Sequence, residues 1–147
     1  MKHFIALFGV FFAFSASAAL VELDSAQEME NLVATSSVPV VIQFSAYWCG
    51  PCKVLTSTMQ RVAQSYDSNE VILAKVDAHV HSSLRKYLMG GYPTVRVFNN
   101  GQVNPTKYFA GSQTESMVRD FIDGAIDNPM GRGLDFSFPA APYSAVQ

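Results

Sequence analysis

Apolar residues recur at helical spacing in several stretches of the chain, and two of these stretches open with a capping box. One box, Ser-Ala-Gln-Glu, lies at residues 25–28 and the other, Ser-Gln-Thr-Glu, at residues 112–115. In a capping box the first hydroxyl accepts a hydrogen bond from the backbone at the start of the helix. Together with the apolar spacing after Cys52, these signals predict helices at about residues 25–35, 52–66 and 112–126, and a short helix at 82–87.

Short apolar runs between the helices predict strands. Residues 40–44 form a nearly continuous apolar run, typical of a central strand covered on both faces, and further runs follow at 71–76 and 94–98. Asn-Asn-Gly at residues 99–101 is a hairpin turn, so a strand at about 103–109 is expected to run antiparallel to the one before it. The order α-β-α-β-α-β-β-α predicts an α/β fold: a central mixed sheet flanked by helices on both faces.

Residues 1–18 have the pattern of a secretory signal peptide. A short basic start precedes an apolar run over residues 4–14, and Ser15–Ala18 supplies the small residues of a signal peptidase site. The run is shorter than the roughly 20 residues that a membrane span needs. We therefore expect cleavage before Ala19 and a periplasmic or secreted location. An uncleaved N-terminal anchor is the alternative.

The remainder of the chain divides into a domain and a tail. Residues 19–128 have the length of one domain with its own core. Residues 129–147 contain three prolines and two glycines without periodicity, and we expect a disordered C-terminal tail. The alternative is an apolar strap that uses Phe136, Phe138 and Tyr143 to contact the domain or a partner.

The charge of the chain narrows the classes of partner. The formal net charge is −2, and no basic run remains after the signal peptide. These features argue against nucleic acid and anionic membranes as partners. We expect a monomer in an oxidising compartment, where a pair of cysteines is seldom without redox chemistry.

Cys49 and Cys52 are the only cysteines, and three uses of such a pair compete. A disulfide closing so short a loop contributes only about 2 kcal/mol before ring strain, which argues against a structural staple. A structural zinc site needs four ligands, and only His79 and His81 are available to complete it. A working dithiol fits best, because the pair follows a buried strand and opens a helix, where the helix N-terminus favours a thiolate.

The position of the two cysteines suggests different roles for them. Cys49 is expected at the exposed mouth of the helix as the attacking thiol, with Cys52 shielded a turn deeper as the resolving thiol. Pro51 suits the first helical turn, where its missing N–H costs nothing, and Gly50 keeps the approach to the sulfur open.

The stretch Trp48-Cys49-Gly50-Pro51-Cys52-Lys53 resembles the active-site signature of the thioredoxin family. The resemblance extends over about residues 22–126. Further landmarks are Ala-Lys-Val-Asp at 74–77, Gly-Tyr-Pro-Thr at 91–94, the hairpin Asn-Gly at 100–101, and Gly111 after the last strand. It implies a thioredoxin fold and a redox-active Cys49–Cys52 disulfide with no cofactor and no metal.

The resemblance also assigns roles around the dithiol. It implies a cis peptide bond before Pro93, which faces the dithiol and lets the backbone of Tyr92 pair with an extended client peptide. Trp48 and Tyr47 are expected to border the groove around Cys49.

Four positions depart from the family pattern. Gln43 replaces a buried aspartate beside the resolving cysteine, and this removes both a proton acceptor and a like charge near the thiols. Lys75 keeps its place but loses that aspartate as its partner. Ser45 stands where many members have tryptophan, and Tyr92 is larger than the usual aliphatic residue before the proline.

These features predict a thiol–disulfide oxidoreductase of the cell envelope that acts on disulfide-containing client proteins. A reductant is expected, kept reduced by a membrane or envelope thiol electron donor. The alternatives are a disulfide oxidase or isomerase, a metallochaperone, and a non-catalytic binding module that docks through Tyr92, Trp48 and the tail.

The expected signal peptide gives a first testable prediction. The mass of the protein recovered from the cell envelope or the medium should correspond to a chain that begins at Ala19, because the small residues before it fit a signal peptidase. A mass that includes residues 1–18 would favour the N-terminal anchor.

Overall fold

The computed structural model describes residues 16–111 and 113–131, and the side chains of Thr106 and Lys107 are outside the description. The described residues form a five-stranded sheet with the strand order β1-β3-β2-β4-β5. Strands β1, β3 and β2 run parallel, whereas β4 is antiparallel to β2 and β5 to β4. The prediction of a mixed sheet is confirmed. The strands are Leu20–Leu23 (β1), Val40–Ser45 (β2), Ile72–Asp77 (β3), Thr94–Asn99 (β4) and Gln102–Ala110 (β5).

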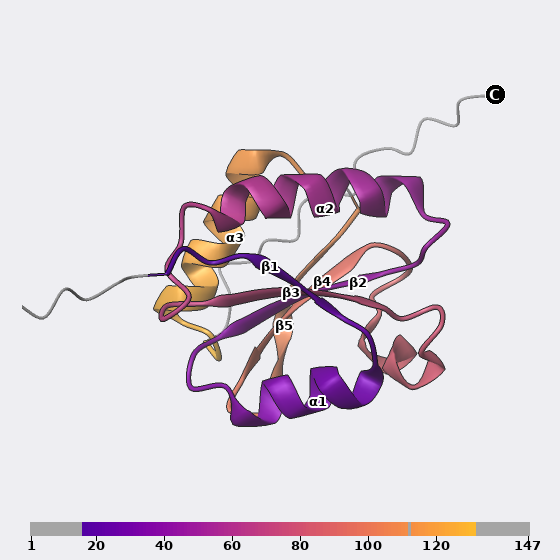
Figure 1. Ribbon diagram of the computed structural model, residues 1–147, viewed down its shortest axis with the longest axis horizontal. Helices are drawn as coiled ribbons and strands as arrows, with labels where there is room; N and C mark the ends of the chain where they lie inside the picture. Colours follow the sequence, from indigo (N-terminus) through magenta and orange to yellow (C-terminus); the bar gives the residue numbers. More distant parts are fainter. Residues whose placement is uncertain (1–15, 112, 132–147) are drawn as a thin grey trace, which may run out of the picture.

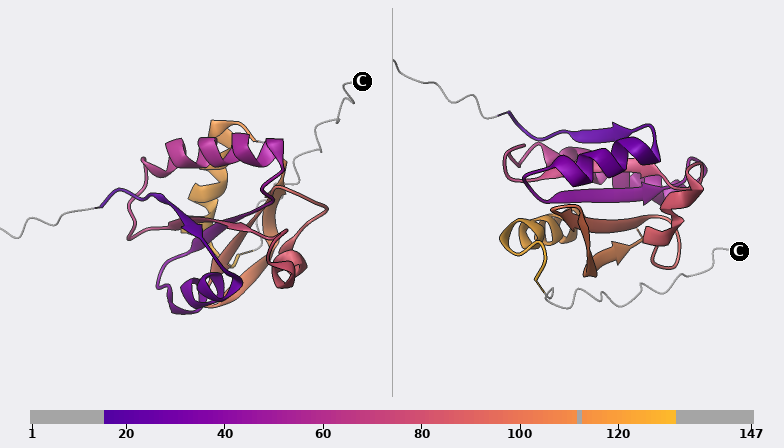
Figure 2. Two further views of the ribbon diagram at one scale, coloured as in Figure 1. Left: turned by 45° about the vertical axis from the view of Figure 1, so that its right-hand side comes forward. Right: turned by 90° about the horizontal axis from the view of Figure 1, so that it is seen from below.

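Helices cover both faces of this sheet, as expected. Helices α2 (Gly50–Ala63) and α3 (Glu115–Asp127) pack on one face, and α1 (Ala26–Thr35) lies on the other (Figure 1). The turned view on the left of Figure 2 shows the same separation. A short 3-10 helix, η1 (Ser82–Tyr87), follows β3 and packs on the α1 face.

Strand β2 is buried on both faces, which explains its continuous apolar pattern. Val41 faces α2 and α3 and joins the core there, while Ile42 and Phe44 belong to the core beneath α1 and η1. Every residue of β2 is buried. The sheet therefore separates two apolar cores, and β2 contributes to both.

Strand β1 is the element that the sequence pattern did not reveal. It is only four residues long and lies at an edge of the sheet, where it pairs with β3 from Leu20 opposite Leu73 to Leu23 opposite Val76. Four residues are too few to establish a period, so this strand depends on its neighbour rather than on a local signal. The observed element order therefore starts with a strand.

The predicted helix ends are correct at α1 and wrong at α3. The Ser25 hydroxyl caps α1 by accepting a hydrogen bond from the Glu28 N–H at 3.1 Å. Helix α3 begins instead at Glu115, and the Thr114 hydroxyl accepts from Met117 N–H at 3.4 Å. Ser112 lies outside the described residues. The sequence predicted a helix opened by the capping box at residues 112–115, whereas Thr114 is the N-cap residue. Helix α2 starts at Gly50, two residues earlier than expected, and ends at Ala63, three residues earlier than expected.

Both ends of the described chain are hydrogen-bonded to the body of the domain. Ala18 N–H donates to Tyr66 O at 2.8 Å at one end. At the other, the buried Asn104 amide donates to Pro129 O at 2.8 Å and to Gly131 O at 3.1 Å. Residues 1–15 and 132–147 lie outside the described residues, so the signal peptide and the C-terminal tail stay predictions. Within the described part of the chain, no helix has the length and apolar character to span a membrane.

The core under α3 gives a prediction for stability. Phe121 is fully buried, and its ring meets that of Phe109 on β5 at 4.8 Å, edge to face. Phe121→Ala should lower the free energy of unfolding by about 3–5 kcal/mol, because it removes this contact and leaves a cavity. Urea denaturation measures the change. Val54→Ala, at an exposed position of α2, is the control and should change stability by less than about 0.5 kcal/mol.

Candidate active site

The end of β2 and the start of α2 bring the two cysteines together. The chain leaves β2 at Ser45, turns through a Cys49 N–H to Ala46 O hydrogen bond of 3.0 Å, and enters α2 at Gly50. Cys49 and Cys52 form a disulfide with their Cα atoms 5.3 Å apart. Pro51 lies in the first turn of the helix, as predicted.

Cys49 is the N-cap residue of α2. Its backbone is extended, and its Sγ accepts a hydrogen bond from the Cys52 N–H at 3.2 Å. The unpaired N–H groups of a first helical turn and the helix dipole favour negative charge at this position. On reduction, the same N–H is placed to stabilise a thiolate on Cys49.

Both sulfurs are buried in the disulfide form. Cys49 is 4% exposed and Cys52 is 2% exposed, so the expectation of an exposed Cys49 is wrong for this form. Ala46 and Tyr92 pack against the pair. Exposure therefore does not distinguish the two sulfurs, whereas Cys49 is the N-cap of α2 and its Sγ accepts the Cys52 N–H. The attacking and resolving roles stay predictions.

Tyr92, which packs against the two cysteines, is followed by Pro93. The peptide bond from Tyr92 to Pro93 is cis, as the family resemblance implied. Pro93 O accepts a hydrogen bond from Gly111 N–H at 3.1 Å, and Gly111 has a φ of +80°, in the region that favours glycine. A role of Tyr92 and Pro93 in binding a client stays a prediction.

Aromatic side chains gather around the disulfide, and a histidine lies among them. The His79 ring is 5.7 Å from Tyr47, 5.6 Å from Trp48 and 6.5 Å from Tyr92, centroid to centroid. Trp48 also meets Tyr92 at 5.8 Å, and Trp48 and Tyr47 remain exposed. We name Tyr47, Trp48, His79 and Tyr92 the ring cluster. It borders the site as expected for Trp48 and Tyr47.

The sequence placed His79 and His81 after a strand, either as polar surface side chains or as candidate zinc ligands. His79 instead packs in the ring cluster, and His81 Nε2 lies 2.9 Å from Asp24 O. Among residues 16–111 and 113–131, no group of three or more His, Cys, Asp or Glu side chains is arranged to hold a metal ion. His79 follows the end of β3, and the cysteine loop follows the end of β2, the parallel neighbour of β3. This position in the sequence could have predicted that His79 lies close to the dithiol.

Gln43 faces the first turn of α2, as its alignment with the family's aspartate predicted. It is fully buried, its Nε2 donates to Cys52 O at 3.0 Å, and its Oε1 accepts from the Thr56 hydroxyl at 3.2 Å. Thr56 Oγ1 also lies 2.8 Å from Cys52 O. The amide thus joins β2 to the helix that carries the dithiol, a contact that an aspartate carboxylate cannot make as a donor. Thr56 was not identified from the sequence.

Lys75 has acquired a different partner. Its Nζ lies 2.7 Å from Glu22 Oε1, and Lys75 is largely covered while Glu22 is mostly exposed. Glu22 belongs to β1, and neither this strand nor the ion pair was predicted from the sequence. The lysine keeps its place but is neutralised from the side away from Gln43.

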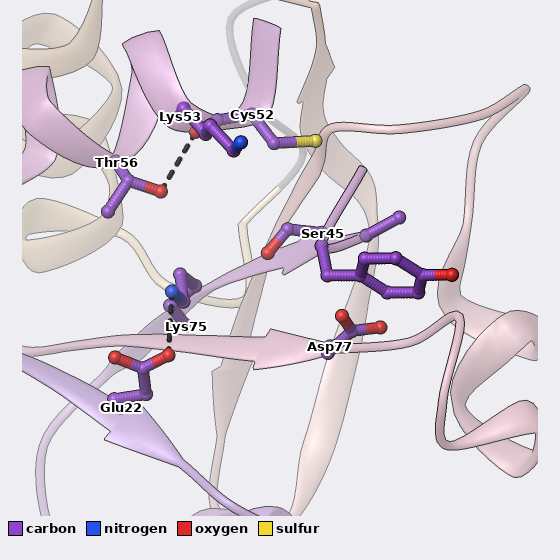
Figure 3. A pocket seen from close by; sticks show the side chains of 9 residues that line it. Glu22, Ser45, Cys52, Lys53, Thr56, Lys75 and Asp77 are labelled. Atoms are coloured by element: carbon purple, nitrogen blue, oxygen red, sulfur yellow. Dashed lines mark hydrogen bonds and ion pairs between the residues drawn. The ribbon is translucent and has the colours of Figure 1, made fainter. Parts of the chain in front are cut away.

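A cavity of about 160 Å³ opens beside Cys52 (Figure 3). Figure 3 shows the Glu22–Lys75 ion pair on one side of it, with Asp77 beneath Ser45. Side chains from β1, β2, β3, α2 and the loop between β2 and α2 line the cavity. They belong to Glu22, Ser45, Ala46, Tyr47, Cys52, Lys53, Thr56, Lys75 and Asp77.

Comparisons with known proteins agree with this geometry. The Thioredoxin family model matches residues 20–124. A probable thioredoxin of Caenorhabditis elegans is 32% identical over 114 residues, which cover 77% of each chain. A protein disulfide-isomerase of Schizosaccharomyces pombe is 34% identical over 116 residues. The match covers 78% of this chain but only 31% of that protein. A thioredoxin structure from Schistosoma mansoni has a TM-score of 0.59 at 28% identity, covering 74% of this chain and 96% of that one.

The chain belongs to the thioredoxin family, and its fold is the thioredoxin fold. With Cys49 and Cys52 joined at the start of α2, the domain is a thiol–disulfide oxidoreductase domain of the thioredoxin type. Its redox centre is a disulfide of the protein itself, and thiol–disulfide exchange passes electrons between sulfurs without a cofactor.

The position of Gln43 gives a prediction for the dithiol. Gln43→Asp places a carboxylate under the first turn of α2, and its repulsion should raise the pKa of the Cys49 thiol by on the order of one unit. Because the thiols are then harder to ionise, the reduction potential should fall by about 30 mV. A pH series of thiol alkylation and equilibration with glutathione measure the two quantities.

Gln43→Asn is the matched control for this prediction. It shortens the side chain by the same amount as Gln43→Asp but adds no charge, and it should leave the pKa and the potential near the wild-type values. Equal behaviour of the two variants would show that geometry, and not charge, governs the effect of residue 43.

Proposed function

We propose that the protein is a thiol–disulfide oxidoreductase of the cell envelope or the extracellular space that reduces disulfides in client proteins. The observation that carries the proposal is the Cys49–Cys52 disulfide at the N-terminus of α2, with Cys49 as the N-cap. The location rests on the signal-peptide pattern of residues 1–18.

The chemistry follows from the position of the two sulfurs. In the reduced protein, the Cys49 thiolate attacks a client disulfide, one client sulfur leaves as a thiolate, and a mixed disulfide forms. The Cys52 thiolate then attacks the Cys49 sulfur, which releases the second client sulfur and restores the Cys49–Cys52 disulfide. Two electrons and two protons pass to the client, and a thiol electron donor in the envelope has to return the protein to its reduced form.

The Cys-Gly-Pro-Cys sequence supports a reducing role, since thioredoxins of this type have potentials near about −270 mV. The second candidate is an oxidase or isomerase. Two observations favour it: the buried carboxylate is replaced by Gln43, and one of the similar proteins is named a protein disulfide-isomerase. A measured potential near about −180 mV or higher would support this second function.

The assignment of the two cysteines gives the central test. Cys52→Ser should accumulate mixed disulfides with clients through Cys49, because the resolving attack is lost. Cys49→Ser should accumulate none, because no attacking thiol remains at the helix start. Non-reducing electrophoresis of proteins captured from the envelope measures both, with wild type as the control.

Insulin reduction by the same three proteins completes the test. Wild type should turn over with dithiothreitol as the electron donor, and both variants should lose nearly all activity. Equal trapping by the two variants would contradict the assigned roles, and an inactive wild type would favour a binding module without catalysis.

A further inference from the structure

One row of the sheet carries polar side chains beneath the dithiol. Glu22 on β1 pairs in register with Lys75 on β3, and Lys75 pairs with Gln43 on β2. Partners in a sheet point to the same face, and Gln43 points toward α2, where it bonds to Cys52 O. The three side chains therefore project side by side from the α2 face of the sheet, and Gln43 contacts the first turn of α2.

The row is polar only on this side of the sheet. Gln43 pairs next with Val95 on β4, and Val95 pairs with Phe109 on β5; both are buried in the apolar core. Charge can therefore act on the dithiol from the β3 and β1 side, where the cavity beside Cys52 is lined by Glu22 and Lys75.

The charged groups around this cavity balance in number. Two cationic side chains, Lys53 on α2 and Lys75 on β3, face two carboxylates, Glu22 on β1 and Asp77 at the end of β3. Asp77 is engaged with the backbone, since its Oδ1 accepts from His79 N–H at 2.8 Å and from Val80 N–H at 3.0 Å. Lys53 is exposed to solvent. The least exposed cation at the cavity is Lys75, and Glu22 neutralises it.

We propose that Glu22, as the counter-ion of Lys75, controls how readily Cys52 loses its proton in the resolving step. The inference rests on the proposed thiol–disulfide exchange and assigns a positioning role to a residue outside the family motif. The field of Lys75 favours a thiolate at Cys52, and the carboxylate at 2.7 Å holds that ammonium at the β1 side and offsets its charge.

Glu22 does not act as the proton acceptor itself. Its Oε1 is held by the Lys75 ammonium at 2.7 Å, and its strand β1 lies two strands away from β2, which carries Gln43. The proton of Cys52 instead leaves to solvent through the open cavity. The Cys52 thiolate then bonds to the Cys49 sulfur, the bond from Cys49 to the client sulfur breaks, and the client thiolate takes up a proton.

The test separates the two steps of the exchange. The reduced full-length protein is mixed in a stopped-flow instrument with 5,5′-dithiobis(2-nitrobenzoate), and the release of thionitrobenzoate is followed from pH 5 to pH 9. The first release reports the attack of one thiol, and the second reports the resolving step. The variants are Glu22→Gln, Lys75→Gln and the double variant.

Glu22→Gln should accelerate the second release about threefold to tenfold near neutral pH and move its pH profile toward lower pH, because Lys75 is left unneutralised. Lys75→Gln should slow it and move the profile toward higher pH. The double variant should lie between them, close to wild type. At the alkaline end, where the thiol is ionised in every variant, the rates should converge.

Three controls separate charge from structure. Glu22→Asp and Lys75→Arg keep the charges and should keep the wild-type profile, and Glu30→Gln, on the exposed face of α1, should have no effect. Circular dichroism verifies that each variant is folded.

A slower second release in Glu22→Gln would make Glu22 a proton acceptor and overturn the proposal, and so would an unchanged pH profile. A wild type that gives no second release at all would instead contradict the proposed function.

Discussion

Burial of strand β2 on both faces is the constraint on which the rest of the structure depends. The strand lies between β3 and β4, and its side chains enter the core beneath α1 as well as the core beneath α2 and α3. A shift of one residue would carry every side chain of β2 to the opposite core, and Gln43 would then leave Cys52 O for the apolar core beneath α1. The loop that leaves it therefore starts from a fixed point, and Cys49 falls at the N-terminus of α2.

The reactivity of the dithiol depends on what surrounds that point. The helix supplies an N–H to Cys49 Sγ, and the neutral Gln43 supplies a hydrogen bond to Cys52 O without adding charge. The carboxylate in the same row of the sheet is that of Glu22, two strands away from Gln43. Lys75 lies between them. The charge that acts on the thiols is consequently set at the edge of the sheet, where water screens it more strongly than in the core.

The ring cluster forms one border of the active site. Tyr92 covers the disulfide, and His79 joins the rings of Tyr47 and Trp48 beside it. Large exposed rings at the edge of a buried disulfide restrict the directions from which a client sulfur can approach Cys49. The similar protein disulfide-isomerase is much longer than this chain, and the match covers only 31% of it. Clients and redox partners are therefore properties to be measured on this protein.

The sequence by itself determined the features that depend on neighbouring residues. The continuous apolar run of β2, the capping hydroxyl of Ser25 and the spacing of Cys49 and Cys52 are local signals, and each is present in the structure. The cis bond before Pro93 followed from the family resemblance instead, because a lone proline does not reveal its isomer.

Only the tertiary structure decided the features that depend on distant partners. Strand β1 is stabilised by its pairing with β3 and has no local sequence signal of its own. Neither the strand nor the Glu22–Lys75 ion pair could therefore be predicted from its four residues. The burial of Cys49 depends on Tyr92, which is 43 residues further along the chain by the numbering of the sequence. Pairing, burial and charge balance are sums over neighbours in space, and a linear pattern records only neighbours along the chain.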